Sequence, residues 1–161
     1  MAIECFLRIP GINGESMDRE FAGQIEVLAW NFGATHPGTM HVGPGGGGGR
    51  VAVRDLAITK WLDRATPLLV QACCAGRHFA DATLTCRRGG PSPVPYVRLK
   101  LDPVLITSVS TGGSVEGDRF TEEISLNFAR FTITYTPQRP DGSADADVGP
   151  LGWDIQANVA I

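Results

Sequence analysis

Three histidines are the residues of this chain best suited to bind a metal ion. His36 and His41 lie in one glycine-rich segment, and His78 follows much later. A helical zinc site needs two histidines four residues apart with a nearby carboxylate as third ligand, and no two of these histidines have that spacing. We therefore expect ordinary surface histidines and no bound metal.

An acidic segment at residues 141–147 imitates the first half of a calcium-binding loop. Asp141, Ser143, Asp145 and Asp147 occupy positions one, three, five and seven of such a loop. A calcium loop of this type also needs glycine at position six and glutamate at position twelve, and this sequence has alanine and glycine there. The segment therefore predicts an acidic hairpin turn.

The sequence also contains fragments of phosphate-binding and nucleophile motifs. The glycine run at residues 43–50 leads into a strand-like segment, whereas a phosphate loop opens a helix whose N-terminus holds the anion. The sequence at 112–116 has glutamate where a nucleophile elbow needs its last glycine. Glu122 and Glu123 are strand neighbours, so they should point to opposite faces. We therefore expect no catalytic site, no cofactor and no enzymatic activity.

The four cysteines form neither a zinc-binding nor a disulfide pattern. Cys5, Cys73, Cys74 and Cys86 include no C-x-x-C spacing. Cys73 and Cys74 are adjacent in a predicted helix, where neighbouring side chains point about 100° apart. We expect these two thiols to be packed rather than bridged to each other, and a reduced, cytosolic place of synthesis fits the cysteine usage best.

The composition limits the fold class and the partners. The length of 161 residues suits one domain, which we expect to span residues 1–161. Twenty glycines and eleven prolines indicate many turns and few helices. A net charge of -3 argues against nucleic acid as a partner. We expect no membrane insertion and no signal peptide, because the apolar stretches are too short and Glu4 and Arg8 interrupt the N-terminal one.

Alternating apolar residues predict about eight β-strand segments. The alternation is regular at residues 3–9, 80–86, 97–101 and 153–158, and residues 104–109 continue a strand past Asp102 and Pro103. Three further segments change face partway along, at residues 23–32, 51–58 and 124–135. A β-bulge or a strand covered on both faces produces such a change. Both explanations predict a closed or strongly curved sheet.

One helix is predicted among these strands. Thr66 can cap it, Pro67 suits its first position and Gly76 ends it. Its apolar stripe consists of Leu68, Leu69, Ala72 and Cys73. We expect this stripe to lie against an open side of the sheet.

Read together, segments from nearly the whole chain resemble the haemolysin-coregulated protein (Hcp) family, the tube protein of bacterial type VI secretion. One of them reads G-Q-I-E-V-L-A-W-N-F-G at residues 23–33. The matching segments are residues 6–16, 23–33, 36–50, 53–60, 63–73, 76–90, 108–114, 122–130, 135–138 and 152–158. Their order and spacing make the joint resemblance specific.

The resemblance implies a mainly β fold, a β-barrel of two packed antiparallel sheets with one flanking α-helix. It also implies that six copies close into a ring and that rings stack into a hollow tube. In this family the tube lies inside a contractile sheath, carries effectors in its lumen and is fired under a spike. Such a protein is synthesised in the bacterial cytoplasm, is exported by the apparatus without a signal peptide, and has no enzymatic activity.

A long loop is the segment that we expect to carry subunit contacts. It spans residues 35–50, and its glycines make it costly to order alone and easy to mould onto a partner. We expect it to dock on an adjacent subunit or ring rather than on its own barrel. The candidate interface residues are Thr35, His36, Met40, His41, Val42 and Arg50.

The competing interpretation is a monomeric β-barrel that binds a small ligand in its interior. Leucine, isoleucine, valine and phenylalanine dominate the predicted inward positions and would fill a small barrel. A closed ring also needs two different faces on each subunit, which strand faces of both registers supply. Both considerations favour the tube.

Overall fold

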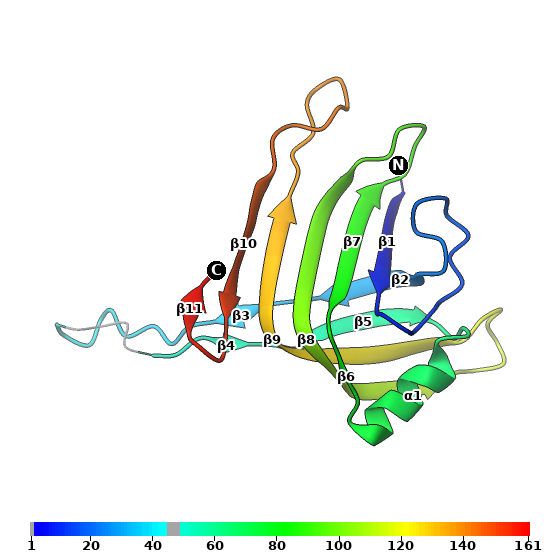
Figure 1. Ribbon diagram of the computed structural model, residues 1–161, viewed down its shortest axis with the longest axis horizontal. Helices are drawn as coiled ribbons and strands as arrows, with labels where there is room; N and C mark the ends of the chain where they lie inside the picture. Colours follow the sequence, from blue (N-terminus) through cyan, green and yellow to red (C-terminus); the bar gives the residue numbers. More distant parts are fainter. Residues whose placement is uncertain (1, 45–48) are drawn as a thin grey trace.

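Long antiparallel strands make up most of the structure, a computed structural model that describes residues 2–44 and 49–161 (Figure 1). These residues form eleven strands and one helix. The elements in chain order are β1 (Ile3–Arg8), β2 (Ile25–Asn31), β3 (Ala34–Thr35), β4 (Ala52–Val53), β5 (Leu56–Trp61), α1 (Thr66–Ala75), β6 (His78–Phe79), β7 (Ala82–Arg88), β8 (Pro95–Gly112), β9 (Thr121–Tyr135), β10 (Val148–Asp154) and β11 (Val159–Ala160).

Six of the strands close into a barrel. The order is β1, β2, β5, β9, β8 and β7, each strand pairs antiparallel with the next, and β7 pairs back with β1. Strands β10 and β11 extend the sheet beyond β9, and β6 lies beside β8. The predicted class, a mainly β barrel of two packed antiparallel sheets with one flanking helix, is confirmed.

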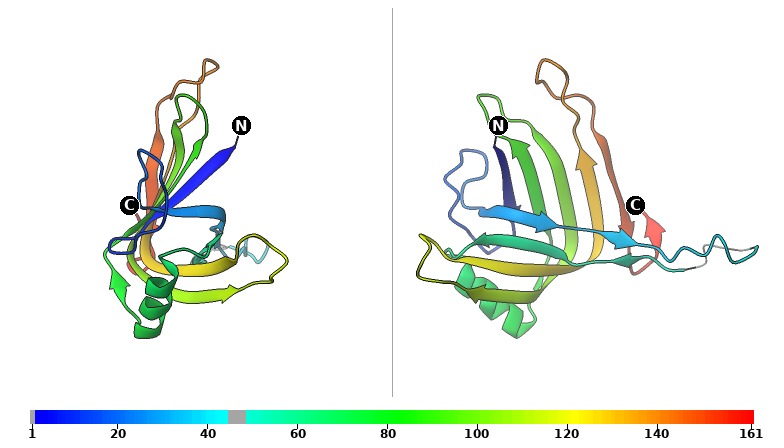
Figure 2. Two further views of the ribbon diagram at one scale, coloured as in Figure 1. Left: turned by 90° about the vertical axis from the view of Figure 1, so that its right-hand side faces the viewer. Right: turned by 180° about the vertical axis from the view of Figure 1, so that it is seen from behind.

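The long β8–β9 hairpin belongs to both layers of the barrel. One half of it pairs with β7 and β10, and the other half pairs with β5 (Figure 2). Strand β8 runs through Asp102 and Pro103 without a break, as the two apolar segments on either side of them predicted. Its register shifts between Ile106 and Ser108, so one extra residue bends the strand.

The three predicted changes of face have different structural causes. In β2 the pairing with β5 shifts between Val27 and Ala29, which is the expected irregularity. In β9 the strand is continuous, and its pairing with β5 ends at Leu126 whereas its pairing with β10 begins at Arg130, on either side of buried Phe128. The prediction of one strand at residues 51–58 is wrong, because β4 and β5 are separate strands that belong to different sheets.

The helix α1 ends as predicted but begins differently. Gly76 adopts the left-handed conformation with φ of 60°, and its N–H donates to the carbonyl of Cys73. Ala65 occupies the N-cap, and the hydroxyl of Thr66 donates to Glu122 instead of capping the helix. The prediction of Thr66 as the cap is therefore wrong. Only Leu69 and Ala72 of the helix are buried, so the stripe facing the barrel is narrower than expected.

The prediction of a strand at residues 153–158 is largely wrong, because only Trp153 and Asp154 lie in β10, which begins at Val148. Strand β10 stops at Asp154, whose carboxylate accepts the N–H of Ala157 at 2.8 Å and closes a turn. Asn158 completes the reversal with a φ of 59°, and β11 follows. The apolar alternation matches β10 up to that turn. The residues beyond it also alternate in sequence, but they form no part of the strand.

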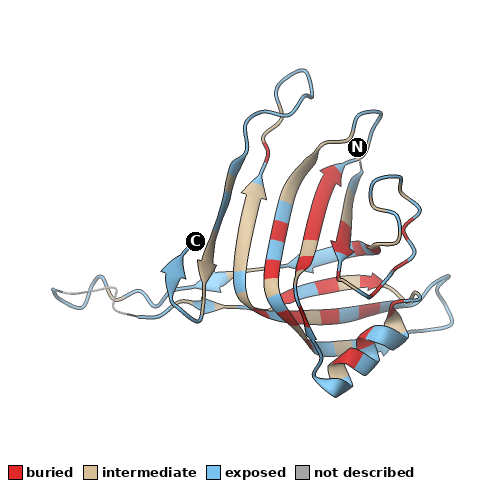
Figure 3. Ribbon diagram, in the orientation of Figure 1, coloured by how far each residue is buried: buried red, intermediate tan, exposed pale blue. Residues whose placement is uncertain are grey.

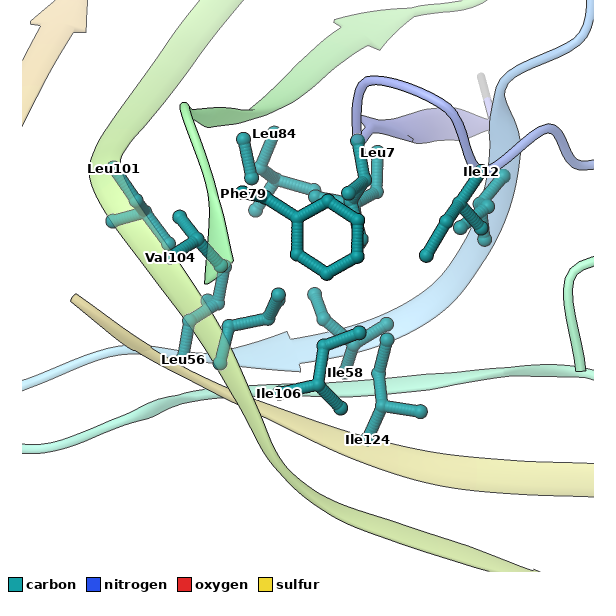
Figure 4. Packing of buried hydrophobic residues seen from close by; sticks show 14 of the residues in the cluster. Leu7, Ile12, Leu56, Ile58, Phe79, Leu84, Leu101, Val104, Ile106 and Ile124 are labelled. Atoms are coloured by element: carbon teal, nitrogen blue, oxygen red, sulfur yellow. The ribbon is translucent and has the colours of Figure 1, made fainter. Parts of the chain in front are cut away.

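Apolar side chains fill the interior of the barrel. Leucines and isoleucines from every barrel strand meet there, together with Phe79 (Figure 4). Figure 3 shows that buried residues concentrate in the barrel strands and on one side of α1, whereas β10 and β11 have none. The core thus occupies the space in which an internal ligand would have to sit.

Candidate assembly surfaces

A two-stranded arm projects from the barrel. Its base is the antiparallel pair β3–β4, with Ala34 opposite Val53 and Thr35 opposite Ala52. We call residues 34–44 and 49–53 the arm, and Figure 1 shows these residues extending well beyond the barrel wall. Residues 45–48 of the predicted loop lie outside the described residues.

The described part of the arm exposes apolar side chains at its far end. Met40 is 82% exposed and Val42 is 66% exposed, and His41 between them is also exposed. The N–H of Val42 donates to the carbonyl of Thr39 at 3.0 Å, which makes this end a turn. Exposed apolar groups at the end of a projecting segment are typical of a surface that a partner covers.

Arg50 ties the returning limb of the arm to its own subunit. Its guanidinium donates to the carbonyls of Ile155 at 2.6 Å and Gln156 at 3.1 Å. These carbonyls belong to the turn between β10 and β11, so Arg50 sets the direction in which the arm leaves the barrel. Of the candidate interface residues, Arg50 at one end and Thr35 in β3 lie at the base of the arm.

An apolar pocket of about 520 Å³ lies between the base of the arm and β10. Val51 and Val53 line its arm side, Leu151 and Trp153 line its β10 side, and His36 lies at its edge. The indole N–H of Trp153 is buried without a hydrogen-bond partner within 2–44 and 49–161. The walls of the pocket are mostly apolar, as at the core of a protein–protein interface.

Further exposed apolar residues surround this pocket. Leu151 is 65% exposed, and Val148, Val159 and Ile161 are also exposed on β10, on β11 and at the chain end. A separate group, Leu28 and Trp30, lies on β2. Sequence reasoning did not identify the β10–β11 surface, although Val148 and Leu151 beside glycine and proline are an exposed-edge signal.

The chemically suggestive residues do not gather into a site. His36 and His41 lie on the arm, and His78 lies in β6. No cluster of three or more histidine, cysteine or acidic side chains within the described ranges has metal-binding geometry. Residues 141–143 form the expected turn, in which Asp141 accepts the N–H and the hydroxyl of Ser143, and these hydrogen bonds lower the pKa of Asp141.

A buried ionic cluster joins β5 and β9 to the start of α1. The ammonium of Lys60 contacts Glu122 and donates to Asp63 at 2.9 Å, and the side chains of Lys60 and Glu122 are fully buried. Glu122 also accepts the hydroxyls of Thr66 at 2.7 Å and Thr111 at 3.0 Å. Every charged group in the cluster has a partner, so it holds the elements together.

A second ionic cluster holds residues 13–24 against the barrel. The guanidinium of Arg87 donates to Glu4 at 2.9 Å and to Asp18. It also lies over the stacked rings of Phe6 and Phe21. The hydrogen bond from Arg87 lowers the pKa of Asp18. Neither cluster opens onto the pocket beside the arm, so both serve the architecture.

Comparison with known proteins identifies the lineage of this barrel. Residues 6–135 match the family model described as "Type VI secretion system effector, Hcp". Protein hcp1 of Pseudomonas aeruginosa is 46% identical over 160 residues, which cover 99% of each chain. The chain belongs to the Hcp family. It is therefore a tube protein of type VI secretion, in a family whose members are secreted.

Solved Hcp structures share the whole fold. The solved structure of a type six secretion system protein superposes on this chain with a TM-score of 0.94. The two sequences are 29% identical, and the match covers 99% of this chain and 100% of the other. Hcp1 from Salmonella typhimurium gives a TM-score of 0.78 at 30% identity over all of both chains. The Hcp resemblance seen in the sequence is thus confirmed over the whole barrel. Across the residues that the structure describes, no helix is long and apolar enough to span a membrane.

Proposed function

We propose that six copies of this Hcp protein close into a ring, that rings stack into a hollow tube, and that the tube carries effectors and is exported with them. In this proposal the sheath and the spike of the apparatus are its other partners. The observation that carries the proposal is the projecting arm, whose end exposes the apolar side chains of Met40 and Val42.

The arm and the surfaces that can receive it are different parts of one subunit. A contact between unlike surfaces repeats from copy to copy, and it produces a ring when the rotation closes. The pocket beside Trp153 and the exposed residues of β10 and β11 offer an apolar surface of the required kind. The arm residues Met40 and Val42 supply apolar groups that such a surface can cover.

The filled interior of the barrel argues against the competing function, a monomeric ligand-binding barrel. The pocket of about 520 Å³ lies beside the arm and outside the barrel, while the barrel itself contains the apolar core. A ligand inside the barrel would have to displace fully buried side chains such as Leu84 and Leu101. A role as a structural subunit without catalysis also fits these features.

The proposal is tested by replacing residues 36–49 with a short Gly-Ser linker, which leaves the β3–β4 pair in place. We expect the barrel to remain folded, as measured by circular dichroism, while ring stacking or export is lost. A linker replacement of the β8–β9 turn at residues 114–119 is the matched control and should assemble normally. Unchanged tube assembly and export of the arm variant would leave the arm as a passive linker and overturn its proposed role.

A further inference from the structure

Two cysteines far apart in the sequence face each other across neighbouring barrel strands. In the pairing of β1 with β7, Cys5 lies directly opposite Cys86. The N–H of Gly89 donates to the carbonyl of Ala2 at 2.8 Å, which marks these two residues as a hydrogen-bonded pair. Such pairs alternate along an antiparallel ladder, so Cys5 and Cys86, three positions further on, form a non-hydrogen-bonded pair.

This register gives the two cysteines the separation that a disulfide needs. Opposed residues of a non-hydrogen-bonded pair have Cα atoms about 4.5 Å apart and side chains that approach closely. A disulfide joins Cα atoms about 4.4–6.8 Å apart. The bond can therefore form between β1 and β7 without a change in their pairing.

The thiols of this pair differ in accessibility. Cys5 is half-buried, whereas Cys86 is buried. The hydrogen bond from Cys86 lowers the pKa of Cys5, and the same bond together with burial raises the pKa of Cys86. Cys5 is thus the more accessible and more readily deprotonated thiol, so reagents in solvent react with it first.

We propose that Cys5 and Cys86 form a redox-active dithiol that a low-molecular-weight disulfide converts into an intrachain cross-link between β1 and β7. The site is reduced in the cytosol and oxidises once the subunit is outside it, a setting that depends on the export proposed above. Once the small disulfide has oxidised the pair, the cross-link stabilises the barrel wall that β1 and β7 form.

The reaction balances as two thiol–disulfide exchanges. The Cys5 thiolate attacks one sulfur of the small disulfide, forms a mixed disulfide and releases one small thiolate. Cys86 then loses its proton and attacks the sulfur of Cys5, which forms the protein disulfide and releases the second small thiolate. The two released thiolates take up the two protons, so the protein is oxidised by two electrons and the small disulfide is reduced by two.

The test uses the full chain carrying Cys73→Ser and Cys74→Ser, which removes the helix cysteines and leaves the proposed pair. The folded protein is incubated with oxidised glutathione, and its thiols are counted after denaturation. We expect the two remaining thiols to disappear, the intact mass to fall by two hydrogen atoms, and the peptides containing Cys5 and Cys86 to be linked. Two thiols that stay free, or a lasting glutathione adduct on Cys5, would overturn the proposal.

Single variants in the same background show which thiol attacks the small disulfide and which one resolves the mixed disulfide. With Cys86→Ser, we expect glutathione to remain attached to Cys5, because no second thiol resolves the mixed disulfide. With Cys5→Ser, we expect buried Cys86 to stay unmodified in the folded protein, and this variant serves if Cys86→Ser does not fold. Rapid modification of Cys86 in the Cys5→Ser variant would contradict the assigned order of attack.

The proposed strengthening is measured separately. The cross-link closes a loop that contains β2, β5 and α1, so we expect the melting temperature to rise by about 5 °C or more on oxidation. An unchanged or lower melting temperature of the cross-linked protein would contradict the stabilising role. Light scattering on the same samples reports ring assembly, so a failed oxidation and a failed assembly are distinguishable.

Discussion

At the residue scale, Lys60 is a buried cation that joins three parts of the chain. It lies on β5, contacts Glu122 of β9 and Asp63 before α1, and donates to the carbonyl of Trp61 at 2.7 Å. A buried ion pair adds little net stability over apolar residues of the same size, but removing one partner leaves an unpaired buried charge. Single and double variants distinguish the small net contribution of the ion pair from the cost of an unpaired buried charge.

Lys60→Met should lower the free energy of unfolding by about 3–5 kcal/mol, because buried Glu122 and Asp63 lose their cation. The double variant Lys60→Met with Glu122→Gln should recover part of that loss. Urea unfolding of the three proteins measures both effects. A single variant within about 1 kcal/mol of the parent protein would show that the cluster does not hold these elements together.

Asp18 gives the molecule an acid-sensitive contact. Arg87 holds the pKa of Asp18 below the 3.8 of a free aspartate, so the contact stabilises the fold above that pH. The stabilisation should diminish as pH falls below 3.8 and through the lower folded pKa. Melting temperatures of the parent protein and Asp18→Asn should therefore differ at pH 7 and converge in strong acid.

The matched control for Asp18→Asn is Asp118→Asn, which changes an exposed carboxylate in the β8–β9 turn. Its melting temperature should follow that of the parent protein at every pH. A difference between the parent protein and Asp18→Asn that stays constant from neutral to strongly acidic pH would contradict the assignment to this ion pair.

The sequence contained part of the information about these residues. Lys60 follows Leu56 and Ile58 on the same face of a predicted strand, so its inward position was readable from the alternation. Its partner Glu122 was correctly predicted to point away from Glu123, but nothing in the sequence linked it to Lys60. Which residues meet across strands depends on register, and the pairing of Cys5 with Cys86 was unpredictable for the same reason.

At the element scale, the close pairing of β10 with β9 shapes the pocket beside the arm. A Cβ atom at Gly152 would lie 1.8 Å from the carbonyl oxygen of Phe131, in the backbone of the neighbouring strand. Only glycine permits this approach, and Trp153 of the pocket is the next residue. The close pairing of β10 with β9 therefore depends on glycine at position 152.

Gly152→Ala should push β10 away from β9 and lower the melting temperature by about 5 °C, since a backbone clash costs about 1–3 kcal/mol. Gly112→Ala is the control, because a Cβ atom there would meet nothing within 4 Å. Differential scanning calorimetry compares the two variants. Equal melting temperatures of the two variants would contradict the role of close packing at Gly152.

Most elements could be predicted because each follows a local pattern. The alternation that gave β1 and β7 and the glycine that ended α1 are signals within a few residues. The predictions failed where a distant contact decided the outcome. Thr66 bonds to Glu122 instead of capping α1, and the chain leaves the arm for the barrel between β4 and β5. Cys74 is exposed, contrary to the packed thiol expected, because α1 presents only a narrow face to the barrel.

At the scale of the whole molecule, the barrel is a self-sufficient support for surfaces that extend beyond it. Its core is filled from within one chain, while the arm, β10 and β11 expose apolar residues outside it. Membership of the Hcp family was readable from the sequence because the matching segments run along nearly the whole chain. Only part of the proposed contact surface could be predicted, since the sequence indicated the arm but not the pocket at its base.

The arm end gives a test of how the subunits join. Replacing Met40 and Val42 together by serine removes two exposed apolar side chains without touching the barrel. We expect unchanged melting of the subunit and weaker association, seen as assembly that requires higher protein concentration in sedimentation velocity. The control replaces exposed Val115, in the β8–β9 turn, by serine and should associate normally. Equal association of both variants would remove the arm end from the interface.

The mass of the assembled protein decides whether six copies form a ring. Light scattering after gel filtration at micromolar concentration gives that mass without reference to shape. We expect a particle of six times the 17.2 kDa subunit, seen as a ring in negative-stain micrographs. A clean monomer under the same conditions would contradict it.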